Sequence, residues 1–376
     1  METKQYPFFI KSTVVLFGII LLVYTLLNLR DILVPLSFAL IIAILLNPLV
    51  SKLQKKKMPS VLAISISLLL GMIFFVGVIY FLSSQIANLG ESLPVLQQKF
   101  GMLLKELQAW LESSWGLSIK KQVQLVNDAL NGSKALISST VGTALGTLAI
   151  LFLLPVYVFL LLFYKSLIVN FLYEVFAEEN SKNVAQILSE TKTAIQSYMV
   201  GILLEATVVA VLNSTALLIL DVKYAVLLGV IGALLNMLPY IGGIIAIALP
   251  VLMATVTKDG YSTQLGIVIA YGIIQFIDNN ILVPRIVSSK VKINALVSIL
   301  VVLLGGALWG IPGMFLSIPF VAVLKIIFDR VEGLRPWGKL LGDEVPTRHK
   351  GEIWGLKKRK KKPSVAEEIV ENSQKD

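Results

Sequence analysis

The chain has 376 residues, of which 56% are hydrophobic and only 15% are charged, and its mean hydropathy is +0.82. A soluble domain carries about 25% charged residues, so this composition excludes an ordinary soluble protein and indicates an integral membrane protein. Cysteine is absent, and the only histidine, His349, lies in the polar C-terminal tail. Thiol chemistry, disulfides and histidine-based catalysis or metal binding are therefore excluded from the membrane part. We expect no cofactor and no metal.

The net charge of +10 comes largely from two basic runs, "SKLQKKK" at residues 51–57 and "KKRKKK" at residues 357–362. Positive charge beside an apolar segment is typical of the cytoplasmic side of a membrane, where it is attracted to anionic lipid. The expected partner of these runs is thus the lipid bilayer, and we expect no nucleic acid.

Six apolar segments are long enough to cross a bilayer, for which about 20 residues suffice. They are residues 8–29, 32–50, 61–82, 141–164, 198–220 and 263–284. The first has no small-residue cleavage site and runs directly into the second, so we interpret it as a membrane anchor rather than a signal peptide.

Two polar inserts separate these spans. After the third span, apolar residues recur at helical spacing at Leu96, Phe100, Leu103, Leu104, Leu107 and Leu111. This pattern predicts two or three amphipathic helices on one membrane face, and Asn131-Gly132 marks an end of the helical pattern. The second insert, residues 166–196, leads into the fifth span.

Two apolar stretches, residues 224–256 and 295–328, are too long for one straight crossing, and each is interrupted near its middle. The interruptions are "NMLPYIGG" and "WGIPGMF", in which proline and glycine weaken the helix. Each stretch therefore reads as two half-helices with an opened backbone between them. The predicted fold is an all-α polytopic membrane protein, with about six spanning helices and two broken elements that are re-entrant or paired.

Basic residues indicate the orientation of the chain. Lys4 precedes the first span, Lys11 lies at its start, and residues 52–57 follow the second span, so both ends of this hairpin belong in the cytoplasm. The first insert is then extracytoplasmic and the second cytoplasmic. If each broken stretch returns to the face it left, Arg285, Lys290 and Lys292 also lie in the cytoplasm, as does the basic tail. This prediction gives a multi-pass membrane protein with both termini cytoplasmic.

The chain is thus expected to divide into six regions. These are N-terminal membrane helices (1–83), an extracytoplasmic amphipathic insert (84–140), a membrane helix (141–165), a cytoplasmic polar insert (166–196), a transport core with broken helices (197–329) and a basic cytoplasmic tail (330–376).

A polar stripe interrupts the sixth span. Gln275 follows Tyr271 by four residues, and Asp278 and Asn279 follow Gln275 by three and four residues, with Asn280 beside them. This spacing places the first four on one helix face. An ionisable residue in lipid costs about 2.5–3.5 kcal/mol on insertion scales, so the stripe must face protein or a water-filled cavity. Oxygen acceptors and amide donors together suit a hydrated cation, a proton or a polar solute.

Both carboxyl groups within the predicted spans, Asp278 and Glu205, also have a purely structural interpretation. Asp278 could be an interfacial anchor or a local partner of Arg285. Glu205, with Asn213 two turns further along the fifth span, could be a neutral acid bonded to another helix. The predicted solute or ion path comprises Gln275, Asp278, Asn279, Asn280, Glu205, Asn236 and Tyr271. The predicted helix breaks and hinges are Pro239, Gly242, Gly243, Pro284, Gly306, Gly310, Pro312 and Gly313.

Three ordered motifs, "NMLPYIGG", "QFIDNNILVPRIV" and "GGALWGIPGMFLSIPFVAVLK", resemble those of the autoinducer-2 exporter family of bacterial membrane transporters. The resemblance covers nearly the whole chain and is strongest from Tyr198 to about Phe328. The matching positions are Pro239, Gly242, Gln275, Asp278, Asn279, Pro284, Gly306, Gly310 and Pro319. The resemblance implies a homo-oligomeric transporter, with a pentamer as one arrangement, in which part of each protomer makes an elevator-like movement.

The leading hypothesis is a secondary transporter that exports a small polar solute or signalling molecule of the autoinducer-2 type. The chain has no evident nucleotide-binding loop, and we predict no catalytic residue. The alternative is a sodium(lithium)/proton antiporter, which the family resemblance also allows, with a monovalent cation as the transported partner. A structural scaffold is more remote, and an intramembrane hydrolase would have only Glu205 and Asp278 to use.

Overall fold

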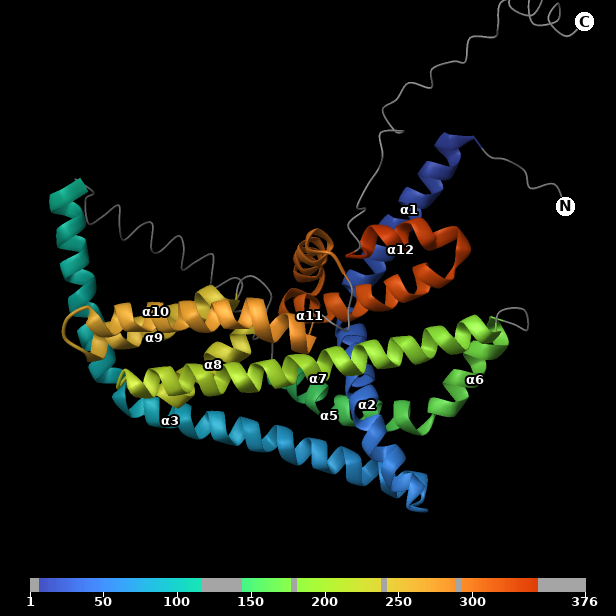
Figure 1. Cartoon of the computed structure of the whole chain (residues 1–376), viewed down its shortest axis with the longest axis horizontal. Helices are drawn as coiled ribbons and strands as arrows, with labels where there is room; N and C mark the ends of the chain where they lie inside the picture. The colour runs from blue at the N-terminus through green and yellow to red at the C-terminus, as the bar shows by residue number, and fades with distance from the viewer. Residues whose placement is uncertain (1–6, 116–143, 177–180, 238–241, 288–292, 344–376) are drawn as a thin grey trace, which may run out of the picture. The chain divides into compact units, whose positions relative to one another are not determined.

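The computed structural model describes residues 7–115, 144–176, 181–237, 242–287 and 293–343. Every regular element within these ranges is helical, and six helices are long and apolar enough to cross a membrane (Figure 1). In chain order they are α1 (Phe8–Asn28), α2 (Arg30–Lys55), the first half of α3 (Ser60–Trp115), α7 (Ser181–Ile219), α10 (Ser262–Ile277) with its continuation η1 (Asp278–Val287), and α11 (Ala295–Arg330). The predicted all-α polytopic fold is confirmed.

Small residues bring α2, α3 and α5 (Ala144–Phe163) together. Ala39 and Ala43 of α2 pack with Ala63 and Ile64 of α3 and with Val158 of α5, and all five are buried. Alanine lets helix backbones approach closely, which is how helices associate where lipid offers no hydrophobic driving force.

Helix α3 continues beyond its apolar part, Ser60–Ala87. It is one helical element of 56 residues from Ser60 to Trp115, including Gly90 and Pro94, where the sequence pattern indicated separate amphipathic helices, and its last part turns away from the first at a steep angle (Figure 1). Glutamine, leucine, lysine and glutamate dominate the outer part, and these are good helix formers that hold one helix together. The pattern that ends at Asn131-Gly132 lies outside the described residues.

The fourth predicted span, α5, bends by 61° into α6 (Lys165–Val175). Helix α7 then begins at Ser181 and runs without interruption into the fifth predicted span. The second polar insert is therefore continuous with the membrane segment that follows it from Ser181 onward, and its residues 177–180 lie outside the described part of the chain.

The first broken stretch forms a hairpin. Helix α8 (Ala225–Asn236) and helix α9 (Gly242–Thr257) pack against each other. Their outer ends also meet, because Lys258 after α9 pairs with Asp221 before α8. This contact shows that the chain comes back to the end from which it started.

The second broken stretch also folds back, within α11. Gly310 has φ 64° and ψ −144°, which no helix contains. A Cβ on Gly313 would lie 2.0 Å from the carbonyl oxygen of Gly305, so the two halves of α11 touch. The start of α11 meets helix α12 (Arg335–Leu341), since the backbone N–H of Asn294 donates to the carbonyl of Leu341 at 3.1 Å.

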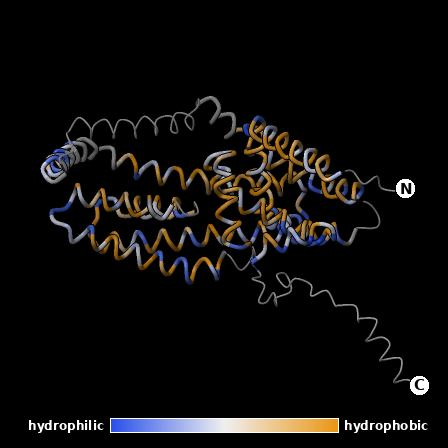
Figure 2. Tube along the Cα trace, turned by 90° about the horizontal axis from the view of Figure 1, so that it is seen from above, coloured by the Kyte–Doolittle hydropathy of each residue, from blue (hydrophilic) through white to orange (hydrophobic). Residues whose placement is uncertain are grey.

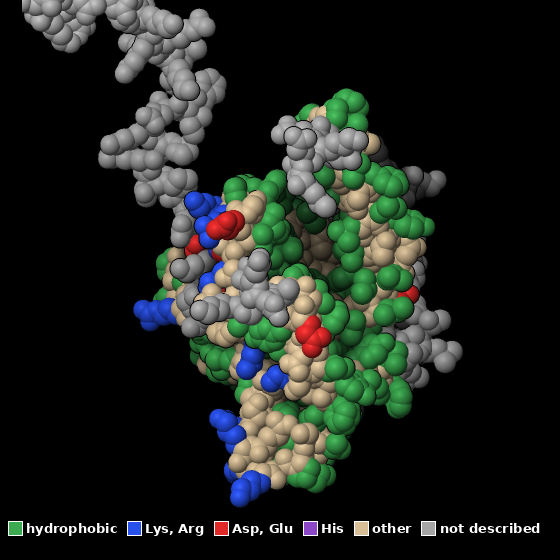
Figure 3. Space-filling model, turned by 90° about the vertical axis from the view of Figure 1, so that its right-hand side faces the viewer, with side chains coloured by type: hydrophobic (Ala, Val, Ile, Leu, Met, Phe, Trp, Pro, Cys, Tyr) green, Lys and Arg blue, Asp and Glu red, His purple; other side chains and the backbone are tan. Residues whose placement is uncertain are grey.

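The surface of the described helices is mostly apolar. Figure 2 shows hydrophobic residues along most of the helical traces. In Figure 3, hydrophobic side chains cover large areas of one face, while Lys and Arg gather toward one end. Exposed apolar area of this extent fits a surface surrounded by lipid tails.

Candidate functional site

Asp278 occupies the centre of the site. It lies where α10 passes into η1, and its side chain is only 2% exposed. Asn236 donates a hydrogen bond from Nδ2 to Asp278 Oδ2 at 2.9 Å, and Gln275 Nε2 lies 3.4 Å from the same oxygen. The other oxygen, Oδ1, is buried and has no hydrogen-bond partner within the described residues. Half of this carboxyl group is therefore available to a further donor or cation.

The break between α8 and α9 places Asn236 on this carboxyl group. Asn236 is the last residue of α8, and α9 starts again at Gly242. A Cβ on Gly242 would lie 1.7 Å from the carbonyl oxygen of Leu235, so the turn closes only because this position has no side chain. A Cβ on Gly243 would lie 3.1 Å from Gln275 Oε1, so the start of α9 also packs closely on α10.

A second carboxyl group approaches from α7. Glu205 is buried, and it interacts electrostatically with Asp278, as expected because α7 packs against η1. Within the described residues, none of the ion pairs includes either carboxyl group, and Arg285 has an exposed side chain. Two buried acids without a basic partner favour a proton or a cation at this place.

The helix widens directly after Asp278. Residues Asp278–Val287 form a π-helix, in which each N–H bonds five residues back. Proline has no backbone N–H, so the turn before Pro284 cannot keep regular α-helical bonding. The widening separates the two asparagines from the carboxyl group. Asn279 is exposed and accepts a 3.3 Å bond from Gln275, whereas Asn280 is exposed and bonds its own helix at the Phe276 carbonyl.

Tyr271 lies further along the same face of α10, buried, and its hydroxyl has no partner within the described residues. Two buried polar residues that the sequence analysis did not assign to the path are close to this face. Asn213 of α7 and Gln264 of α10 each have an unpaired side-chain oxygen in the described part of the chain. Gln264 could have been found from its spacing, because it precedes Tyr271 by seven residues, as Tyr271 precedes Asp278.

Most of the other predicted hinge residues form the second hairpin. Gly310 supplies the left-handed backbone conformation, Pro312 follows it, and Gly306 and Gly313 allow close packing of the two halves. The tip is fixed to the N-terminal helix, because Trp309 Nε1 donates to the Leu26 carbonyl at 3.0 Å. This hairpin is thus not part of the polar cluster at Asp278. Pro239 lies outside the described residues.

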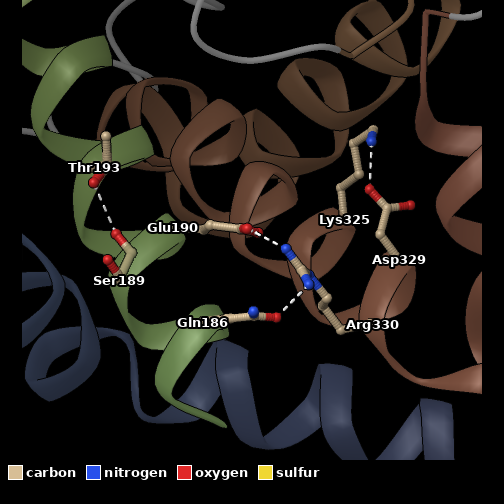
Figure 4. A network of polar contacts seen from close by, with 7 residues as sticks. All are labelled: Gln186, Ser189, Glu190, Thr193, Lys325, Asp329 and Arg330. Atoms are coloured by element: carbon tan, nitrogen blue, oxygen red, sulfur yellow. Dashed lines mark hydrogen bonds and ion pairs between the residues drawn. The ribbon is translucent and has the colours of Figure 1, made fainter. Parts of the chain in front are cut away.

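A separate polar network links α7 to the end of α11 (Figure 4). Arg330 bonds both Gln186 and Glu190 of α7, and Lys325 pairs with Asp329 at 2.6 Å. Helix α7 therefore contacts both hairpins, the second through this network and the first through Ser214, which packs against Gly229 of α8.

The chemistry available at Asp278 is that of oxygen acceptors and amide donors. No group of three or more His, Asp and Glu side chains within the described residues is arranged to hold a metal ion. The buried acids can exchange a proton or compensate a monovalent cation, and the amides of Asn236 and Gln275 can bond a polar solute.

The sequence of the chain is similar to those of known transport proteins. Residues 12–333 match the model of the AI-2E family transporter. The chain is 27% identical to the AI-2 transport protein TqsA of Escherichia coli (strain K12) over 83% of its own length and 90% of that protein. It is also 27% identical to the putative transport protein YrrI and 28% identical to the putative transport protein YueF, both of Bacillus subtilis (strain 168). These matches cover 79% and 78% of this chain, and 86% and 82% of the two relatives.

The relatives carry the names of a transport protein, of putative transport proteins and of a putative permease, and the described part of this chain has six helices long and apolar enough to cross a membrane. With its buried polar cluster among apolar helices, this multi-pass membrane protein belongs to the AI-2E family of transporters.

Proposed function

We propose that the protein is a secondary transporter that exports a small polar solute or signalling molecule of the autoinducer-2 type across the bacterial inner membrane. Export of such a molecule is supported by the name of the relative TqsA, an AI-2 transport protein. In this proposal Asp278 handles the coupling proton or cation, and Asn236 and Gln275 bond the solute. The protein works as a homo-oligomer and catalyses no reaction.

One observation carries the proposal. A carboxyl group that is 2% exposed keeps one oxygen unpaired within the described residues, next to two side-chain amides. A charged group inside a membrane is costly, and such groups in membrane proteins mark substrate, ion or proton pathways. Asn236 belongs to the tip of a broken helix, and broken helices form the sites of many secondary transporters.

The proposed orientation places both termini in the cytoplasm. Lys52, Lys55, Lys56 and Lys57 follow the first helical hairpin, and Arg285 follows the buried carboxyl. Positive residues in short loops favour the cytoplasmic side. The end of the molecule with Asp221 and Lys258 is then extracytoplasmic.

Replacement of Asp278 tests the proposal. Asp278→Asn keeps the shape but removes the acid, and we expect transport by proteoliposomes to fall at least about hundredfold, because a general acid or base contributes about 10²–10⁴-fold to a step that it serves. Asn280→Ala is the matched control, since Asn280 is exposed and bonds only its own helix carbonyl. Full transport by Asp278→Asn, with normal insertion of both variants, would remove Asp278 from the mechanism.

The pair of Glu205 and Asp278 favours a second candidate, sodium(lithium)/proton antiport. Two interacting carboxyl groups can exchange protons for a monovalent cation without any organic solute. Addition of sodium or lithium to proteoliposomes should then move protons, and Glu205→Gln should abolish that movement. Cells lacking the protein would accumulate the signalling molecule only if the first candidate is correct.

A further inference from the structure

Three buried oxygen atoms beside the α8–α9 hairpin have no hydrogen-bond partner within the described residues. They are Asn213 Oδ1, Tyr271 Oη and Gln264 Oε1, on side chains that are 2%, 4% and 9% exposed. Buried polar groups in proteins are nearly always bonded to protein or to ordered water. Several unpaired acceptors in one region therefore indicate a shared ligand that donates hydrogen bonds.

Two of these atoms share a helix face with Asp278. Gln264, Tyr271 and Asp278 are seven residues apart along α10 and its end. Residues at this spacing return to within about 20° of the same direction and lie about 10.5 Å apart along the axis. Asp278, which also has an unpaired oxygen in the described part of the chain, is thus the innermost of three polar levels on one face.

The remaining unpaired oxygen, Asn213 Oδ1, belongs to α7 and lies at the level of Tyr271. A Cβ on Gly232 of α8 would lie 3.3 Å from Asn213 Nδ2 and 3.6 Å from Tyr271 Oη. Asn213 and Tyr271 therefore lie on either side of the same glycine, together with Ala246, whose Cβ would lie 3.5 Å from that of residue 232. Glu205, eight residues earlier on α7, interacts with Asp278 at the innermost level.

The outermost level lies near charged residues at the end of the hairpin. Gln264 is the third residue of α10, which begins four residues after Lys258. Lys258 pairs with Asp221, whose side chain is 90% exposed. The polar face of α10 thus begins at an aqueous surface and leads inward to Asp278.

We infer that Gln264, Asn213 and Tyr271 line a file of water molecules that connects Asp278 with the membrane face carrying Asp221 and Lys258. Water can donate a hydrogen bond to each of the three oxygens. Ile267 and Ile274, at the edge of the same helix face, are buried and apolar, so they bound the file on one side. The file deepens the proposed function, since it gives protons and small polar solutes a route to Asp278. Its purpose depends on that function, but its hydration can be measured without transport.

Single cysteines test the file directly, because the chain contains no native cysteine. Membranes carrying Gln264→Cys or Asn213→Cys are treated with silver ion, and the remaining thiols are counted with a fluorescent maleimide after denaturation. Reaction at both positions should be at least about tenfold faster than at Ile267→Cys, since close-packed interiors exclude water and ions. Leu265→Cys, at a residue that is 62% exposed to the apolar surroundings, is the lipid-facing control.

Gly232→Ala gives a second, milder variant. The added methyl group would lie between Asn213 and Tyr271 at the distances given above, so the fold tolerates it while the file is narrowed. Silver should react about tenfold more slowly with Asn213→Cys in this background, while Gln264→Cys, nearer the surface, should react as before.

A further experiment uses the unsubstituted protein, so its result cannot be affected by misfolding of a variant. In X-ray radiolytic footprinting, a side chain next to bound water is oxidised, so Tyr271 should be modified. Tyr271 and Met199 are 4% and 3% exposed, and both belong to apolar clusters. Of the two, Tyr271 has a polar atom that lacks a partner within the described residues, so Met199 should stay unmodified. Unmodified Tyr271 together with thiols at positions 213 and 264 that silver does not reach would overturn the water file.

Failure of the two proposals can be told apart. If Asp278→Asn abolishes transport but Tyr271 stays unmodified, the transport role stands and the water file is wrong. If Tyr271 is oxidised but Asp278→Asn transports normally, the file exists and Asp278 is not the coupling residue.

Discussion

The two hairpins of this protein have a similar backbone design and different chemistry. Each is a broken apolar stretch that returns to its starting end and depends on glycine for close packing. At the break of the first hairpin, the end of α8 carries Asn236 onto a buried carboxyl group. At the break of the α11 hairpin, Trp309 bonds the backbone of α1. The comparison teaches that a broken helix does not by itself make a binding site, because among the described residues the bond to an acid is made at one break and not at the other.

The largest effect is expected where glycine holds a hairpin closed. In Gly313→Ala the new methyl group would lie 2.0 Å from the Gly305 carbonyl oxygen. Overpacking of this kind costs about 1–3 kcal/mol or more, so thermal unfolding in detergent should occur several degrees lower. Gly77→Ala is the control, since nothing lies within 4 Å of its Cβ position. Equal stability of the two variants would show that the halves of α11 are not packed together.

Substitutions at the two helix breaks should affect different properties: one should slow transport and the other should lower stability. Asn236→Ala removes the 2.9 Å hydrogen bond to Asp278. A hydrogen bond to a charged group contributes about 1.5–3 kcal/mol, so its loss should slow transport at least about tenfold. Trp309→Phe removes the bond to Leu26 and should lower stability by about 1 kcal/mol with transport nearly unchanged. Proteoliposome uptake and thermal unfolding, measured on both variants, check this. A transport defect of equal size in Trp309→Phe would mean that both tips take part in the site.

The smallest effect concerns how the outer ends of the hairpins are held. Lys258 bonds Asp221 and holds the pKa of that carboxyl below its usual range. An acid whose pKa is lower in the folded state than in the unfolded state stabilises the fold at pH values above its unfolded pKa. This stabilisation is lost as the pH falls through the pKa of the folded state. Hydrogen exchange around residues 220–224 and 258–261 should therefore become faster in acid, and Lys258→Gln should abolish that pH dependence. The start of α11 is held instead by the neutral Asn294, which donates to the carbonyls of Leu340 and Gly342, so exchange there should not respond.

The elements that the sequence predicts best are those set by hydrophobic length and by proline and glycine. Both broken stretches and the crossing helices follow from apolar runs and their interruptions. The sequence analysis grouped Asp278 with Gln275 by their spacing of three residues, and their side chains are close in space. The continuity of α3 through Gly90 and Pro94 could not be foreseen, since local breakers compete there with a long series of helix formers.

Contacts between distant segments could not be derived from spacing. Asn236 and Asp278 are 42 residues apart, and only the folding back of the hairpin brings them together. Asn280 was grouped with Asp278 because the two are close in sequence, but two residues correspond to roughly half a helical turn. The Asn280 side chain is exposed and bonds the Phe276 carbonyl of its own helix. Regular α-helical geometry does not hold for the turns before Pro284.

The bend in α3 has a mechanical consequence. Of its 56 residues, Ser60–Ala87 form the apolar part, and the last part of the helix turns away from the first at a steep angle (Figure 1). The residues after Ala87 span about 42 Å along the helix at 1.5 Å per residue. By simple leverage, a change of about 10° in the inclination of a helical arm of that length moves its far end through roughly 7 Å. Small rearrangements among the packed helices are thus magnified at the end of this arm.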